Sequence, residues 1–191
     1  IDLVQYSGEQ WLPLDKSLRD FYYVGVREYF RSVVAGLPEA KRAKYREQAE
    51  PPAGERLKSL ALRRQPSDLA QLARILPFTV ASAQALNLAG NLYLDRGQYA
   101  EAADAFSRLL QDGPALPPEA FGGASARPLL PAAICVKWAF ALILDRQWQA
   151  ARQALETLAK DFAKDSLAWQ GQTLTGAQAA QRLQARLQQA L

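Results

Sequence analysis

Apolar residues recur every three or four positions along nearly the whole chain, and segments that alternate apolar and polar residues are almost absent. This spacing is typical of α-helices that bury one face, because about 3.6 residues complete one helical turn. The pattern therefore predicts an all-α fold. Residues 1–14 do not follow the pattern, and we expect them to form an irregular lead-in.

Prolines, glycines and capping residues divide this pattern into separate helices. In an N-terminal helical part, residues 15–78, the first helix is expected to begin at Asp15 or Ser17 and end near residue 35. A second is expected to end at Pro51-Pro52, a third to cover 53–64 and a fourth 66–76. In residues 79–191 we expect helices at 80–96, 99–111, 131–145 and 148–162, a long loop at 115–131, and a last helix capped by Thr175. Residues 15–191 together are expected to form one continuous domain.

The sharpest motif lies in residues 86–114, which read LNLAGNLYLDRGQYAEAADAFSRLLQDGP. Small side chains at Gly90 and Ala102 predict that two helices cross closely there, and Gly97 permits a tight turn between them. The motif resembles the tetratricopeptide repeat, a helix–turn–helix unit of about 34 residues. This resemblance implies antiparallel helix pairs stacked as a short α-solenoid. The residues that carry it, and are expected to pack the pair, are Ala89, Gly90, Tyr93, Gly97, Tyr99, Ala102 and Phe106.

A weaker second copy follows, in which Arg146 stands where the first copy has Gly97. One such helix pair leaves an apolar face uncovered, so neighbouring pairs are expected to stack and the flanking helices to act as caps. The corresponding packing residues of this copy are Trp138, Ala139, Leu142, Trp148, Ala151 and Leu155.

Three further segments extend the resemblance: VGVREYFRSVVAGLP, KYREQAEPPAGERL and WQGQTLTGAQAAQRLQARL. Together with the repeat, they are similar to a helical region of bacterial envelope proteins of the planctomycete type. In those proteins the region adjoins quinoprotein-like β-propellers. The resemblance covers roughly residues 14–190 and implies a scaffold or docking segment at the bacterial envelope or in the periplasm, with a β-propeller in the full-length protein or complex. It leaves the cytoplasm open as the compartment.

The formal net charge is +4, and the excess is local, since nine basic and five acidic residues lie from Glu39 to Arg74. This basic stretch has two interpretations. It is either a solvated helix face, because acids are interleaved with the bases, or a surface at residues 41–74 that binds nucleic acid or an anionic membrane surface.

Candidate catalytic chemistry is scarce in the sequence. Histidine is absent, which excludes imidazole bases, His metal ligands and Ser-His-Asp triads. The single cysteine, Cys135, is expected to be a small buried hydrophobe. Phosphate-binding glycine motifs are absent. We therefore expect a protein without enzymatic activity, metal or cofactor.

Two further features concern membranes and processing. No apolar run reaches the length of about 18 residues that a membrane-spanning helix needs. The sequence begins at Ile1 rather than at methionine, so we expect a processed or excised piece.

These observations favour a non-catalytic protein–protein interaction scaffold that binds a peptide or a neighbouring subunit. Asn87, Asn91 and Leu94 fall between the packing residues of the first repeat helix, so we expect them to contact the partner. Trp11 and Trp169 lie in less regular segments and are further contact candidates.

Overall fold

The structure, a computed structural model, describes residues 11–13, 23–122, 130–169 and 171–190. Helices dominate these residues, which confirms the predicted helical class, and two short antiparallel hairpins accompany them. The helices are α2 (Val26–Gly36), α3 (Glu39–Arg63), α4 (Pro66–Ile75), α5 (Val80–Asp95), α6 (Tyr99–Asp112), η1 (Gly113–Ala115), α7 (Glu119–Gly122), α8 (Pro131–Leu144), α9 (Trp148–Lys160) and α10 (Gly176–Ala190). The strands are β1 (Trp11–Pro13), β2 (Tyr23–Gly25), β3 (Ser166–Trp169) and β4 (Gln172–Thr175).

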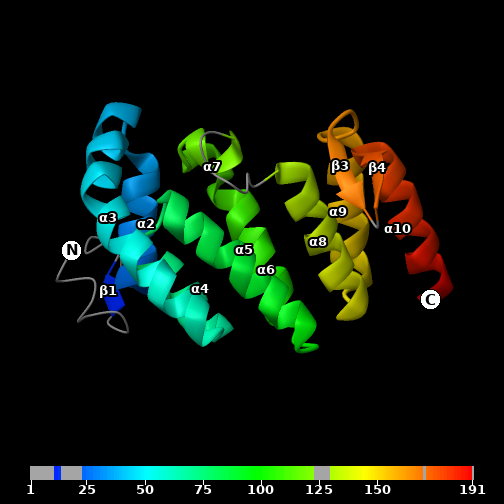
Figure 1. The fold of residues 1–191 in the computed structure, drawn as a ribbon, viewed down its shortest axis with the longest axis horizontal. Helices are drawn as coiled ribbons and strands as arrows, with labels where there is room; N and C mark the ends of the chain where they lie inside the picture. Colours follow the sequence, from blue (N-terminus) through cyan, green and yellow to red (C-terminus); the bar gives the residue numbers. More distant parts are fainter. Residues whose placement is uncertain (1–10, 14–22, 123–129, 170, 191) are drawn as a thin grey trace.

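The main helices follow one another across the molecule in sequence order, with α2 and α3 at one end and α10 at the other (Figure 1). Four of them, α3, α5, α8 and α10, form one layer. Each of α4, α6 and α9 packs against the helices of this layer that precede and follow it in sequence. Direct contacts join α3 to α5 and α8 to α10, and a side-chain hydrogen bond joins α5 to α8.

The α5–α6 pair crosses closely at Gly90. A Cβ atom placed there would lie 2.6 Å from the aromatic ring of Phe106, whose side chain is fully buried. Ala89 and Ala102 are also completely buried, on α5 and α6 respectively. The expected nesting of two helices through small side chains is confirmed for this pair.

The second pair, α8–α9, repeats the turn of the first despite its different sequence. Gly97 and Arg146 both adopt a left-handed conformation, with φ of 73° and 59°. In each turn the next backbone N–H reaches five residues back, from Gln98 to the Tyr93 carbonyl and from Gln147 to the Leu142 carbonyl, both at 2.9 Å. Arg146 therefore preserves the turn without the glycine that makes it easy.

A third left-handed residue, Arg64 with φ of 52°, joins α3 to α4. The Arg96 guanidinium, in the following turn, donates to the Arg64 carbonyl at 2.7 Å and to the Gln65 side-chain oxygen at 3.2 Å. Successive inter-helix turns are thus tied together at one edge of the molecule.

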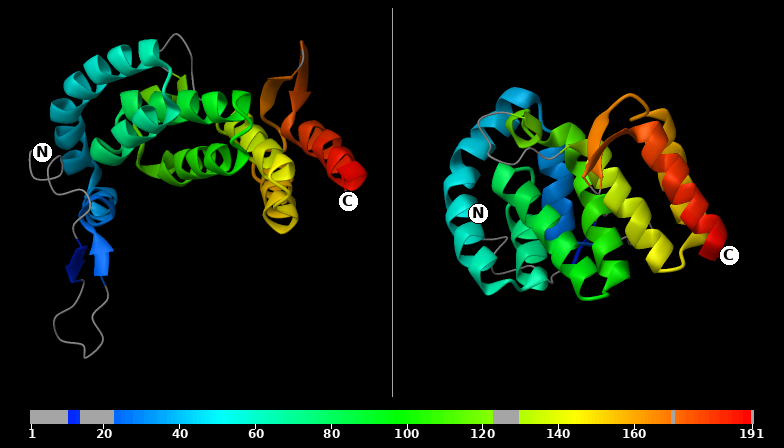
Figure 2. Two further views of the ribbon diagram at one scale, coloured as in Figure 1. Left: turned by 90° about the horizontal axis from the view of Figure 1, so that it is seen from below. Right: turned by 45° about the vertical axis from the view of Figure 1, so that its right-hand side comes forward.

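The predicted break at Pro51-Pro52 is wrong, since α3 continues through both prolines as one helix (Figure 2). Both prolines are exposed, so water can reach the carbonyls that lose their N–H donors. Ala49 and Ala53 flank them and are fully buried in the core. The Glu50 carboxylate also accepts hydrogen bonds from the first N–H groups of α5, at 2.8 and 2.9 Å. Tertiary contacts therefore override the local signal.

The predicted first helix begins later than expected. Residues 23–25 form strand β2, which pairs antiparallel with β1, and α2 begins only at Val26. The expected caps Asp15 and Ser17 lie outside the described residues. The irregular lead-in expected at residues 1–14 is described only at Trp11–Pro13, where it is a strand. A strand this short carries too few residues to show an alternating pattern.

The segment expected to be one long loop, residues 115–131, is partly helical. The short helices η1 and α7 lie in or beside it, and Leu116 and Ala120 are buried in the main core. Residues 123–129 lie outside the description.

The predicted loop before the last helix instead contains the β3–β4 hairpin. The Thr175 cap is confirmed. Its hydroxyl oxygen accepts from the Gln178 N–H at 3.3 Å, and the Gln178 side-chain oxygen accepts from the Thr175 N–H at 2.9 Å. This reciprocal pair is a capping box.

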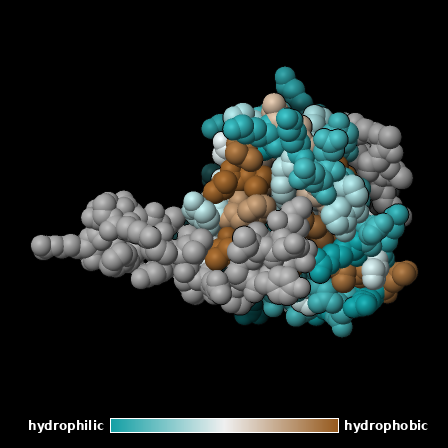
Figure 3. Space-filling model, turned by 90° about the vertical axis from the view of Figure 1, so that its left-hand side faces the viewer, coloured by the Kyte–Doolittle hydropathy of each residue, from teal (hydrophilic) through white to brown (hydrophobic). Residues whose placement is uncertain are grey.

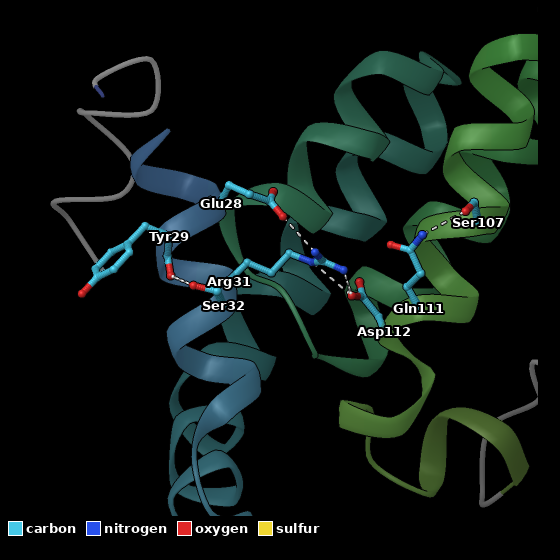
Figure 4. Close-up of polar contacts among 7 residues, drawn as sticks. All are labelled: Glu28, Tyr29, Arg31, Ser32, Ser107, Gln111 and Asp112. Carbon is cyan, nitrogen blue, oxygen red and sulfur yellow. Dashed lines mark hydrogen bonds and ion pairs between the residues drawn. The ribbon is translucent and has the colours of Figure 1, made fainter. Parts of the chain in front are cut away.

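Helix α2 is held to the body by an ion pair from Arg31 to Asp112, at the end of α6 (Figure 4). The Arg31 Nε also donates to Asp112 Oδ1 at 3.1 Å, and Arg31 Nη1 lies 2.9 Å from Glu28. At this end, hydrophobic residues appear among hydrophilic ones on the surface (Figure 3). Tyr29, Val33 and Leu62 are exposed on α2 and α3.

Candidate partner-binding groove

A groove of about 290 Å³ lies where α8, β3 and α10 meet, and we call it the α8–α10 groove. Its wall is mainly apolar, with one cation from each of the two helices. The residues that matter for its chemistry are Val136, Lys137 and Phe140 from α8, Leu167 and Trp169 from β3, and Arg186 from α10.

The β3–β4 hairpin brings Trp169 to this groove. Leu167 and Leu174 face each other across the hairpin, and both are buried against α8, α9 and α10 in a shared core cluster. Because side chains alternate along a strand, Trp169 lies on the same face as Leu167, two residues further on. Trp169 is half-buried and packs against the same cluster.

Lys137 is a half-buried cation on α8. Its Nζ donates to the Asn87 side-chain oxygen of α5 at 2.9 Å and lies 5.7 Å from the centroid of the Phe106 ring. Burial lowers the pKa of the Lys137 ammonium. Ion pairs within the described residues involve Arg31, Arg42 and Arg46, so Lys137 has no carboxylate partner among them.

Arg186 supplies the second cation. Its guanidinium carbon lies 5.9 Å from the centroid of the Phe140 ring, a cation–π geometry that orients the group at the groove. Among the described ion pairs, none includes Arg186. The groove therefore holds two cations, each placed over a different aromatic ring.

Charges are segregated between the two layers of helices. The segments of α5, α8 and α10 contain a single acidic residue, Asp95, which is the last residue of α5. The cations on these helices are Lys137, Arg182 and Arg186. The acids lie on α6 and α9 instead, at Glu101, Asp104, Asp112 and Glu156. The groove side is therefore electropositive.

The predicted contact residues are distributed unequally around this groove. Trp169 lines it, and Asn87 is joined to it through Lys137. Asn91 is half-buried on α5, and Leu94 packs against the main core. Trp11 lies in β1, near the opposite end of the molecule, and its side chain is outside the description. The contact roles of all five stay predictions.

The residues expected to pack the two repeats lie in or beside the core. Ala89, Gly90, Ala102, Phe106, Ala139 and Ala151 are buried, and Gly97 lies in its turn. The larger aromatic residues are half-buried or lie at the rim of the same interfaces: Tyr93, Tyr99, Trp138 and Trp148.

Sequence reasoning missed Lys137, Phe140 and Arg186 as members of a site. One signal was present in the sequence, because the segments 131–144 and 176–190 contain cations and no acid. Only the tertiary structure brings these two segments to one groove.

The basic stretch at residues 41–74 lies on α3 and α4. Two of its arginines are engaged in internal contacts, because Glu39 forms ion pairs with both Arg42 and Arg46. These hydrogen bonds, from Arg46 first and then Arg42, lower the pKa of Glu39. Arg46 also donates to the Ala115 carbonyl at 3.3 Å.

Other groups add little chemistry to the described residues. Cys135 is buried as expected, and burial raises the pKa of its thiol to about 12. No cluster of three or more His, Cys, Asp or Glu side chains suited to a metal occurs in the described ranges. Every helix in the described part of the protein is too short or too polar to cross a membrane.

Comparison with known proteins gives no relative for this protein. No family model matches it, and neither a curated protein nor a solved structure does.

Proposed function

We propose that this protein is a tetratricopeptide-like α-solenoid that acts as a non-catalytic protein–protein interaction scaffold. The solenoid arrangement is supported by the recurrence of one turn geometry, with Arg64, Gly97 and Arg146 each left-handed between paired helices. The alternation of α3, α5, α8 and α10 with α4, α6 and α9 supports it further.

The docking site of this scaffold is the α8–α10 groove. The observation that carries this assignment is the combination of an apolar wall with two cations that have no carboxylate partner among the described residues. Trp169 and Arg186 are residue types that concentrate binding energy at protein interfaces. The occupant is a segment of another protein that carries negative charge.

Site-directed photo-crosslinking tests this function. A photoreactive phenylalanine analogue replaces Trp169 in the full-length protein, and a matched variant carries it at Gln153, an exposed position on α9. In extract from the native source, we expect a discrete protein to be trapped at position 169 and not at 153. Trp169→Ala should then weaken binding of the purified partner while the thermal midpoint stays nearly unchanged. Equal trapping at both positions, or none at position 169, would contradict the assignment.

The Asn87 and Asn91 pair gives a second test, independent of cross-linking chemistry. Replacing both with alanine should weaken binding of the same partner with little change in thermal midpoint. A large fall in stability would instead assign these two side chains to the core.

A further inference from the structure

We infer that the α8–α10 groove binds an internal acidic segment of a partner protein, in which two carboxylate side chains flank one apolar side chain. This inference rests on the proposed scaffold function and specifies the chemistry of its ligand. Three features support it: the two cations, the apolar surface between them, and the absence of acids on α8 and α10.

Lys137 is a cation without a charge partner among the described residues. A partly buried ammonium group is costly unless an anion or several hydrogen bonds compensate for its lost hydration. Within the described structure its neighbours are the neutral Asn87 amide, at 2.9 Å, and the Phe106 ring. A carboxylate that enters the groove would provide the missing charge partner. Binding would therefore gain a charge-assisted hydrogen bond at a site where the desolvation cost has already been met.

The separation of the two cations indicates the number of anions. Arg186 belongs to α10 and lies over the Phe140 ring, whereas Lys137 belongs to α8 and lies over the Phe106 ring. Two cations held on different elements and over different rings offer two separate anion contacts. The C-terminus of a polypeptide supplies one carboxylate at its end, but an internal acidic segment supplies two. The arrangement therefore favours an internal segment.

The apolar wall accounts for the central side chain of the ligand. Val136, Phe140, Leu167 and Trp169 line the same groove as the two cations. An apolar side chain placed there would bury surface against two aromatic rings, while acidic neighbours reach the cations. The nearest helices add no repulsion, because α8 and α10 contain no acidic residue.

The experiment titrates the full-length protein with a peptide that contains Glu-Leu-Glu between Gly-Ser spacers, acetylated and amidated at its ends. Binding is followed by NMR shifts of the Trp169 indole, assigned with the Trp169→Phe variant. We expect saturable binding with a Kd of about 1 mM or tighter. Matched peptides carry Gln-Leu-Gln, Glu-Ser-Glu, or a free C-terminal leucine without glutamate. Each should bind at least about fivefold more weakly.

Charge variants test the two cations separately. Lys137→Met and Arg186→Gln should each weaken Glu-Leu-Glu binding roughly tenfold, the loss expected for one charge-assisted contact. Arg182→Gln is the matched control on α10, because Arg182 is outside the groove and donates to Gln172 at 2.9 Å. It should change the affinity less than about twofold. The thermal midpoint of Lys137→Met should not fall, which separates lost binding from lost folding.

Several results would overturn this inference. Equal binding of Glu-Leu-Glu and Gln-Leu-Gln would remove the role of charge, and tighter binding of the free C-terminal leucine would replace the internal segment. Absence of Glu-Leu-Glu binding would also overturn it. If position 169 still captures a partner whose affinity Lys137→Met and Arg186→Gln leave unchanged, the acidic ligand fails and the scaffold stands. If the peptide binds as expected but no protein is captured, the scaffold fails and the acidic site stands.

Discussion

Gly90 of α5 lies against the ring of Phe106 in α6 so closely that a Cβ at position 90 would come within 2.6 Å of two ring carbons. The Phe106 side chain is fully buried, so it cannot swing out into solvent to make room. This contact sets how closely the two helices of the first repeat approach each other.

Gly90→Ala should therefore destabilise the protein by about 1–3 kcal/mol, the usual cost of overpacking a core. Gly54→Ala is the matched control, since Gly54 is also inside a helix but a Cβ placed there would have nothing within 4 Å. That control should stabilise the protein by about 0.5–1 kcal/mol, because alanine is the better helix former. Urea unfolding followed by circular dichroism measures both.

A double-mutant cycle tests whether Phe106 is the cause. Phe106→Leu should cost less in the Gly90→Ala background than in the wild type, because the shorter side chain relieves the clash. Additive effects of the two substitutions would show that the close approach is not what limits position 90.

Arg146→Gly should stabilise the protein, since Arg146 holds a left-handed conformation with φ of 59°. Left-handed backbone costs an ordinary residue roughly 1–2 kcal/mol, part of which glycine returns through its larger unfolded-state entropy. We expect a net gain of about 0.5–1 kcal/mol in the free energy of unfolding. Gly97→Ala, at the equivalent turn, should give the opposite sign. Two substitutions that shift stability in the same direction would show that the turns are not equivalent.

Asp112→Ala should loosen α2, because the buried carboxylate holds Arg31 to the end of α6. The expected cost is about 1–3 kcal/mol, reduced from that of a fully buried pair because the Arg31 side chain is partly exposed. Hydrogen exchange should show faster exchange in Val26–Gly36 than in α8. Glu28→Gln, on the exposed side of the same arginine, is the control and should have little effect. Unchanged protection of α2 would mean that apolar packing alone holds it.

The pH dependence at Asp112 has an unusual sign. Burial raises the pKa of this carboxyl above its ordinary value, and the hydrogen bond from Arg31 offsets this only in part. A raised pKa in the folded state contributes stability that is fully present below the unfolded pKa and is lost as pH rises through the folded pKa. The stability of the wild type relative to Asp112→Asn should therefore increase as pH is lowered from about 7 to about 4. Urea melts of both proteins at the two pH values measure this difference, and a decrease toward acid would contradict it.

Cys135 should be inert to thiol reagents in the folded protein. Its side chain is buried, its Sγ donates to the Ala154 carbonyl at 3.6 Å, and its thiol pKa is raised to about 12. At pH about 8.5 only the unfolded protein has appreciable thiolate, so alkylation should follow unfolding. Mass spectrometry of iodoacetamide-treated protein with and without urea measures this, with Cys135→Ala as the blank. Rapid labelling in native buffer would show that α8 opens readily.

Much of the fold follows from local pattern. The apolar spacing predicts most of α4, α5, α6, α8 and α9 to within a few residues, because each buries one continuous face. The repeat motif also predicts the crossing at Gly90, since a missing side chain and a large ring at fixed offsets only make sense if they meet.

The remainder depends on contacts between segments distant in sequence. Helix α3 passes through Pro51-Pro52 because Ala49, Ala53 and Glu50 are held by α4 and α5, which no local window of sequence contains. The β3–β4 hairpin exists because Leu167 and Leu174 are buried against three helices.

The same division applies to the candidate site. From the sequence by itself come the helical class, the first repeat and the acid-poor composition of the segments that become α8 and α10. Only the tertiary structure decides that Lys137, Trp169 and Arg186 line one groove, because their meeting depends on how α10 and the hairpin pack on α8. Side-chain spacing determines which face of a helix is buried, but the charge environment of a groove is a property of all the elements that surround it.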